Sequence, residues 1–144
     1  MSKKQLPIQF KLVHIEEKQF ASFDDVLENE NPIEQEIGFG FGVNIEQRVI
    51  GVTMKFILHK QKLPLIKLET ACYFEIESEA FKNMLVQAEE IELPCGFGRH
   101  LAMITTGTAR GILFANTKNT AFNKFLIGLV NVDEMFKENI RIEL

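Results

Sequence analysis

Three neighbouring segments of this chain alternate between apolar and other residues with a period of two. The apolar positions are Ile37, Phe39, Phe41, Val43 and Ile45, then Val52, Met54, Phe56 and Leu58, and then Ile66, Leu68, Cys72, Phe74 and Ile76. Successive side chains of a β-strand point to opposite faces of a sheet, so each segment predicts a strand with one apolar face. Short connections, such as residues 61–64, join the segments and favour antiparallel pairing. The pattern therefore predicts an antiparallel sheet that is covered on one side.

The first of these segments has glycine at three consecutive positions of its other face, namely Gly38, Gly40 and Gly42. Glycine weakens a strand, so three on one face need an explanation. Two explanations stay open. Either this face is exposed to solvent, or the missing side chains let another strand, subunit or extended ligand approach the backbone closely.

A further strand is predicted near the N-terminus, where Ile8, Phe10 and Leu12 alternate with their neighbours. Residues 16–36 follow and are rich in Asp and Glu. We expect them to form a long irregular connection with one short helical turn at most. This strand and the three alternating segments make four strands in all.

The rest of the chain is predicted to be helical. Ser78 is a candidate N-cap for a helix that has Phe81, Met84, Leu85 and Ala88 at helical spacing. After a break at residues 94–98, a second helix is predicted over residues 99–115, with Leu101, Ile104, Thr108, Ile112 and Ala115 on one face. Asn131 or Asp133 can cap a last short helix. The prediction is a single α+β domain over residues 1–144, in which helices pack on one face of a four-stranded antiparallel sheet.

Composition argues against several classes of protein. The net charge is −4 at pH 7, and a nucleic-acid-binding domain is normally strongly basic. No segment approaches the roughly 20 apolar residues that span a bilayer, so membrane insertion is not expected. Residues 1–7 lack the apolar core of a signal peptide, which favours a cytoplasmic protein. In that reducing compartment Cys72 and Cys95 are expected to be free thiols.

No catalytic or metal-binding pattern is recognisable in the sequence. His14, His59 and His100 are widely spaced, and the glycines of residues 38–42 and 96–98 do not follow the register of a phosphate-binding loop. We therefore predict that the protein is not an enzyme and uses no metal or cofactor. Its aromatic residues are 13 Phe, one Tyr and no Trp, which together with five Met can form an adaptable apolar surface.

The C-terminal third resembles the SecB family of export chaperones. The resemblance rests on Gly107-Thr108-Ala109-Arg110-Gly111-Ile112-Leu113-Phe114-Ala115, on Phe125-Leu126-Ile127-Gly128-Leu129 and on Val130-Asn131-Val132-Asp133-Glu134-Met135-Phe136. The order of the predicted elements follows the family along nearly the whole chain. The resemblance implies a SecB-like fold, assembly into a dimer or tetramer, and ATP-independent binding of non-native polypeptides in apolar grooves. It also implies a role in protein export or in a toxin–antitoxin system.

Three departures from the family pattern accompany this resemblance. Gly107 and Thr108 stand where a proline often precedes the Ala-Arg pair, and Leu129 stands where a proline often precedes Val-Asn. The crossover between Ile76 and the long helix is longer than usual and acidic, with Glu89, Glu90 and Glu92. In addition, the sequence ends at Leu144 without the tail that helps family members to meet the export ATPase. Contact with that ATPase is therefore doubtful.

The resemblance also suggests site residues. The candidates for polypeptide binding are Phe81, Met84, Leu85, Ile91 and Phe97, and those for an oligomer interface are Thr108, Gly111 and Ile112. Arg110 is expected to be structural and tied to a carboxylate or to backbone carbonyls, because a buried unpaired guanidinium is costly. Asp133 is one candidate partner for it.

Two alternatives come from other classes of protein. The first is a small-ligand-binding or enzymatic α+β domain with a pocket between sheet and helices, for which His14, Thr108 and Arg110 are the available polar residues. The second is an assembly adaptor that docks a partner on the glycine-lined strand. A closed pocket would favour the first alternative, whereas open apolar grooves would favour the chaperone.

Overall fold

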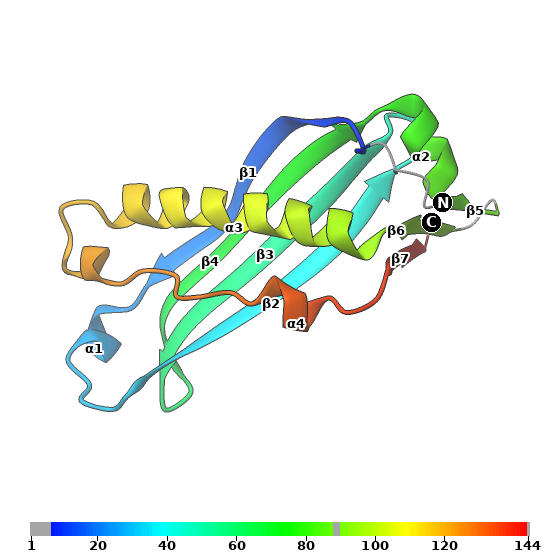
Figure 1. Cartoon of the computed structure of the whole chain (residues 1–144). Helices are drawn as coiled ribbons and strands as arrows, with labels where there is room; N and C mark the ends of the chain where they lie inside the picture. Colours follow the sequence, from blue (N-terminus) through cyan, green and yellow to red (C-terminus); the bar gives the residue numbers. More distant parts are fainter. Residues whose placement is uncertain (1–6, 88–89, 144) are drawn as a thin grey trace.

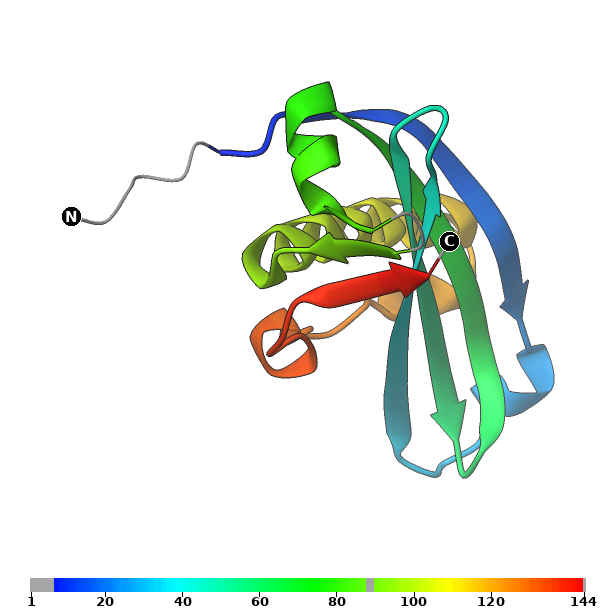
Figure 2. The same ribbon diagram turned by 90° about the vertical axis from the view of Figure 1, so that its right-hand side faces the viewer.

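The computed structural model describes residues 7–87 and 90–143. Two layers make up the molecule (Figures 1 and 2), and the predicted α+β fold with a four-stranded antiparallel sheet is confirmed. Helix α3 (Cys95–Thr117), the C-terminal segment and a small three-stranded sheet lie on one face of the large sheet, which we call the inner face. Helix α3 and the small sheet leave the outer face uncovered (Figure 2).

The large sheet has the strand order β1-β4-β3-β2. Its strands are β1 (Phe10–Ser22), β2 (Ile33–Asn44), β3 (Val49–Lys60) and β4 (Leu63–Ile76). Phe41 pairs with Val52, and Val52 with Cys72, so the apolar positions of the three alternating segments share the inner face as predicted. Gln61 and Lys62 turn the β3–β4 hairpin with positive φ angles of 47° and 67°. Leu63 and Pro64, predicted as turn residues, already belong to β4.

The core lies between the inner face and α3 in two adjoining clusters. One contains Met54, Phe56 and Leu58 against Ala109 and Leu113 of α3. The other contains Val52, Cys72 and Phe74 against Leu101, together with Phe81, Met84, Ile91, Leu93 and Ile142 of the small sheet and its flanking helix. Cys72 is buried with a free thiol, as expected of a small core residue.

The predicted irregular connection over residues 16–36 is wrong at both ends. Strand β1 continues to Ser22, and β2 begins at Ile33 rather than at residue 37. Only α1 (Asp24–Leu27) and its flanks fill the space between them. β1 is an edge strand with two bulges, one between Leu12 and His14 and one between Glu17 and Gln19. Each bulge shifts the alternation by one residue, and this hides the strand from a search for period two.

The segment after β4 also differs from the prediction. Helix α2 (Ser78–Met84) is capped by Glu77 rather than Ser78, since the Glu77 carboxylate accepts hydrogen bonds from the N–H groups of Glu79 and Ala80. The helix ends at Met84, and Leu85 begins a strand; Ala88 lies outside the described residues. Strands β5 (Leu85–Val86), β6 (Glu90–Leu93) and β7 (Ile140–Glu143) form the small sheet, which was not predicted. Its β6–β7 pair joins segments about 50 residues apart, a contact that local periodicity does not report.

Helix α3 begins four residues before the predicted start, with Pro94 at its N-cap position. Its buried stripe includes Leu101, Thr105, Ala109 and Leu113. Of the predicted face only Leu101 is buried, whereas Ile104, Thr108 and Ile112 are half-buried and Ala115 is exposed. Thr105 can be buried because its hydroxyl donates to the Leu101 carbonyl oxygen at 2.8 Å. After η1 (Ala121–Lys124), helix α4 (Val132–Met135) begins at Asn131, whose side chain accepts from Glu134 N–H, as predicted.

Candidate functional site

A strongly exposed apolar surface lies where residues 125–131 pass the start of β2. We call these residues, which connect η1 to α4 without helix or strand, the strap (Figure 1). Leu129 is 98% exposed, Leu126 66% and Ile33 44%. Ile33, Leu126 and Leu129 are called the strap surface below. Burial of large apolar side chains is strongly favourable, so apolar side chains left in water are candidate contact residues.

The other side of the strap packs into the core. Ile127 is buried in the cluster around Phe56, and Phe125 and Val130 are half-buried against the same cluster. The strap therefore shows apolar side chains both inward and outward. It acts as part of the core and as an exposed apolar surface.

Two side chains hold the strap from opposite sides. Gln35 of β2 accepts a hydrogen bond from Gly128 N–H, with 2.6 Å between N and Oε1, and its Nε2 lies 3.5 Å from the Leu129 carbonyl oxygen. Arg110 of α3 donates from Nη2 to the Gly128 carbonyl oxygen at 2.9 Å and from Nε to that of Ile127 at 3.3 Å. The Arg110 guanidinium thus bonds backbone carbonyls, one of the two arrangements expected from the sequence.

Asp133 does not partner Arg110, so that expectation is wrong. Its carboxylate lies 3.6 Å from Nε of Arg99, and its carbonyl oxygen accepts from Arg99 Nη2 at 3.3 Å. Arg99 Nε also donates to the Phe136 carbonyl oxygen at 2.7 Å. Asp133 lies against the first turns of α3, whereas Arg110 is about three turns further along the helix.

The five residues suggested for polypeptide binding do not form one surface. Phe81, Met84 and Ile91 are 3%, 4% and 0% exposed and belong to the core. Phe97 is half-buried, with its ring edge-on to Phe10 at 5.5 Å between centroids. Leu85 is exposed. Their placement outside the alternating strands suggested a surface location, but the small sheet and α2 form a second part of the core there.

The residues suggested for an oligomer interface lie along the side of α3. Thr108 and Ile112 are half-buried, and Gly111 is exposed; apart from the adjacent residues and the backbone of its own helix, no described atom lies within 4 Å of the position that a Cβ would take. Met103 and Phe114 of the same helix are exposed at 43% and 51%. This part of α3 is accessible to a second copy, and assembly there stays a prediction.

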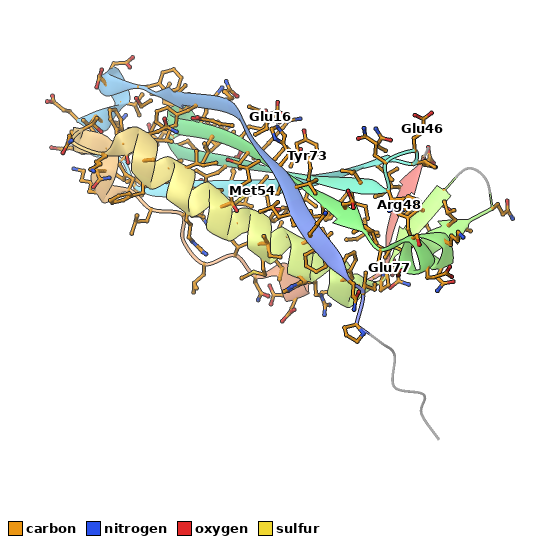
Figure 3. The ribbon with its side chains drawn as sticks, turned by 90° about the horizontal axis from the view of Figure 1, so that it is seen from above. Glu16, Glu46, Arg48, Met54, Tyr73 and Glu77 are labelled. Atoms are coloured by element: carbon orange, nitrogen blue, oxygen red, sulfur yellow. The ribbon has the colours of Figure 1, made fainter. Side chains whose placement is uncertain are left out.

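The outer face of the sheet carries the remaining polar features. Tyr73 donates a hydrogen bond to Glu16 at 2.9 Å, and this bond, with burial and the carboxylate charge, raises the pKa of the Tyr73 phenol (Figure 3). The Tyr73 ring lies over Gly51, where a Cβ would be 3.1 Å from the ring. No described atom lies within 4 Å of a Cβ built at Gly38, Gly40 or Gly42, so these glycines are open to solvent.

Two shallow hollows also lie on the outer face. One of about 260 Å³ is lined by residues that include Gly42, Gly51 and Tyr73, and one of about 230 Å³ by residues that include Glu36, His59 and Lys67. The polar residues named for a pocket between sheet and helices are not brought together. His14 lies beside Tyr73 with the two rings tilted by 32°, Arg110 holds the strap, and the Thr108 hydroxyl donates to the Ile104 carbonyl oxygen.

Within residues 7–87 and 90–143, no three His, Cys, Asp or Glu side chains are arranged to hold a metal ion. No helix in the same part of the chain is long and apolar enough to cross a membrane.

The chain was compared with family models, curated proteins and solved structures. No family model matches the chain, and no curated protein matches it. Among solved structures, the fold is similar to the Mycobacterium tuberculosis Rv1957 SecB-like chaperone in complex with a ChAD peptide from the Rv1956 HigA1 antitoxin. That similarity has a TM-score of 0.44 and 12% sequence identity, and covers 85% of this chain and 91% of that one. At this level the likeness does not establish a family, and the functional argument rests on the site.

Proposed function

We propose that the protein is an ATP-independent holdase that binds segments of non-native polypeptides on the strap surface. The observation that carries the proposal is the exposure of Leu129, Leu126 and Ile33 beside the edge strand β2. An edge strand presents unpaired N–H and C=O groups, and an extended polypeptide can bond to them while its apolar side chains cover the exposed leucines. Such contacts are independent of client sequence, which suits a holdase.

The charges of the edge strand favour extended clients that are not acidic. Glu34 and Glu36 of β2 are exposed and alternate with Gln35, so they lie on the outer face, where every second side chain of a client paired with this edge would lie beside them. Their carboxylates lie 4.0 and 3.3 Å from the His59 imidazole. The Arg110 guanidinium is occupied by the strap carbonyls. We expect basic and apolar segments to bind better than acidic ones, with affinity falling as salt rises.

We propose further that the protein is a homo-oligomer, a dimer or a tetramer, in which Thr108, Gly111 and Ile112 contact a second copy. The open space at Gly111 and the exposed Met103 and Phe114 on the same helix support this assignment. Small residues let two helices approach closely, and an apolar helix surface of this kind gains from being covered.

The test of the function is suppression of aggregation. A chemically reduced model protein is diluted from urea into buffer with this protein, with and without ATP. We expect suppression at severalfold molar excess that does not depend on ATP. Leu129→Ser should weaken it, whereas Ile45→Ser, at an exposed apolar position in the β2–β3 turn, should not. Absence of suppression for several different clients would overturn the proposal.

A further inference from the structure

The strap is attached to the rest of the molecule in an unusual way. Within the described residues, no backbone–backbone hydrogen bond joins residues 126–130 to the sheet or to α3. Their polar attachment is through the side chains of Gln35 and Arg110, which meet at Gly128. A segment with so few bonds opens at lower free energy than the strands beneath it.

Both ends of the strap are anchored more firmly. On one side, η1 is capped by Thr120, whose hydroxyl accepts from Phe122 N–H at 3.1 Å. On the other side, Asn131 caps α4, and Arg99 bonds the Phe136 carbonyl oxygen at 2.7 Å. An opening motion would therefore be confined to residues 125–131, because the flanking turns stay attached.

The strap covers an apolar part of the inner face. Phe125, Ile127 and Val130 pack against the cluster that contains Met54, Phe56 and Leu58. Ile37 and Phe39 of β2 border the same cluster and are half-buried. If the strap lifts, these side chains of β2 and β3 become accessible next to Leu126 and Leu129.

We propose that the strap is a displaceable cover, and that a bound polypeptide takes the place of its buried side chains on the inner face of β2 and β3. This inference rests on the proposed function, since it specifies how the same site admits its client. The exposed leucines make the first contact, and Gln35 and Arg110 determine how readily the strap opens. The site therefore stays mostly covered until a client competes for it.

Gly128 is the position where the strap depends on a missing side chain. A Cβ there would lie 3.1 Å from Oε1 of Gln35 and 3.5 Å from its Nε2. Gln35 can accept from the Gly128 N–H at 2.6 Å because that space is empty. Gln35 is thus the side chain whose loss should loosen the strap without disturbing the core.

The test compares hydrogen exchange of the full chain with Gln35→Ala, Gln35→Glu and the control Gln47→Ala, which lies in the β2–β3 turn. Without client, Gln35→Ala should raise exchange at residues 126–130 by roughly 2- to 12-fold, the range that loss of one net hydrogen bond gives. Gln35→Glu keeps the acceptor for Gly128 N–H and should stay closer to the wild type. Amides of β3 should be unchanged in all three variants. Equal exchange in Gln35→Ala and Gln47→Ala would overturn the proposal that Gln35 holds the strap.

Adding reduced, carboxymethylated lactalbumin as client then separates two modes of binding. Displacement predicts that exchange of the strap rises while amides of β2 become protected, and that Gln35→Ala binds the client more tightly. Binding on top of a closed strap predicts protection of the strap itself, and that result would overturn the displacement. If neither the wild type nor Gln35→Ala binds the client, both the proposed function and the displacement by a polypeptide are refuted. The exchange measured without client still shows whether the strap opens.

Discussion

Gln35 and Arg110, one from the sheet and one from the helix, bond the N–H and the C=O of the same residue, Gly128. The two side chains are 75 positions apart in the sequence and meet only through the strap. A single residue of the connection thereby links β2 to α3. This arrangement is the basis of the first prediction.

Arg110→Ala should lower the free energy of unfolding by about 1–3 kcal/mol, because the carbonyl groups of Ile127 and Gly128 lose a charged donor. Urea denaturation followed by circular dichroism measures the change. Lys137→Ala, at an exposed position after α4, is a suitable control. Unchanged stability together with loss of client binding would show that Arg110 acts in binding rather than in structure.

Lys60→Met should also be destabilising. Lys60 is 6% exposed, and its Nζ donates to the carbonyl oxygens of Leu27 at 2.9 Å and Asn29 at 2.7 Å, at the end of α1. Methionine can fill the space of the aliphatic stem but leaves both carbonyls without this donor, for a cost of about 1–3 kcal/mol. Lys62→Met at the exposed hairpin tip should have little effect. Equal midpoints in urea for the two variants would contradict this assignment.

Gly111→Leu should weaken assembly of the oligomer. The structure has open space at this position, so a larger side chain fits in the single chain, and only a closely approaching partner would exclude it. Light scattering after size exclusion measures the mass of both proteins against the 16.5 kDa of one chain. Gly96→Leu, another helix glycine in open space, controls for the substitution itself. If the wild type is a monomer at micromolar concentration, the proposed interface is contradicted.

Phe81→Ser should destabilise the fold, whereas Leu85→Ser should not. Phe81 is 3% exposed, and truncating a buried phenylalanine costs about 3–5 kcal/mol. Leu85 is exposed, so its replacement should change the melting temperature little. Thermal unfolding measures both. A stable Phe81→Ser variant would mean that this side chain is not part of the core.

Glu77→Gln should reduce stability at neutral pH and lose that effect in acid. Hydrogen bonds from the N–H groups of Glu79 and Ala80 lower the pKa of Glu77 from its ordinary value of 4.5. A lowered pKa means that the ionised group stabilises the folded state above pH 4.5, and this stabilisation disappears as the pH falls through the folded-state pKa. Melting temperatures of the two proteins should therefore differ at pH 7 and converge in acid. A difference in melting temperature that persists below the folded-state pKa of Glu77 would assign the effect to packing.

Much of the fold could be predicted from the sequence because it depends on local alternation. The regular pattern of Phe39, Phe41, Met54, Phe56 and Phe74 determines which face of the sheet is buried, since a shift by one residue would expose all of them. The cap at Asn131 follows equally from local chemistry, because its side chain needs only an N–H three residues away. The helix contact suggested by Gly111 stays a prediction.

The strap surface and its clamp depended on tertiary structure. The sequence of residues 125–130 is apolar throughout, and nothing local distinguishes Ile127, which is buried, from Leu126 and Leu129, which are exposed. For the same reason, the sequence analysis predicted that Phe81, Met84 and Ile91 lie on a surface. They are buried, because β6 pairs with β7 from about 50 residues further along the chain. Hydrophobicity determines that a side chain gains from burial, whereas the arrangement of distant segments decides which side chains are covered.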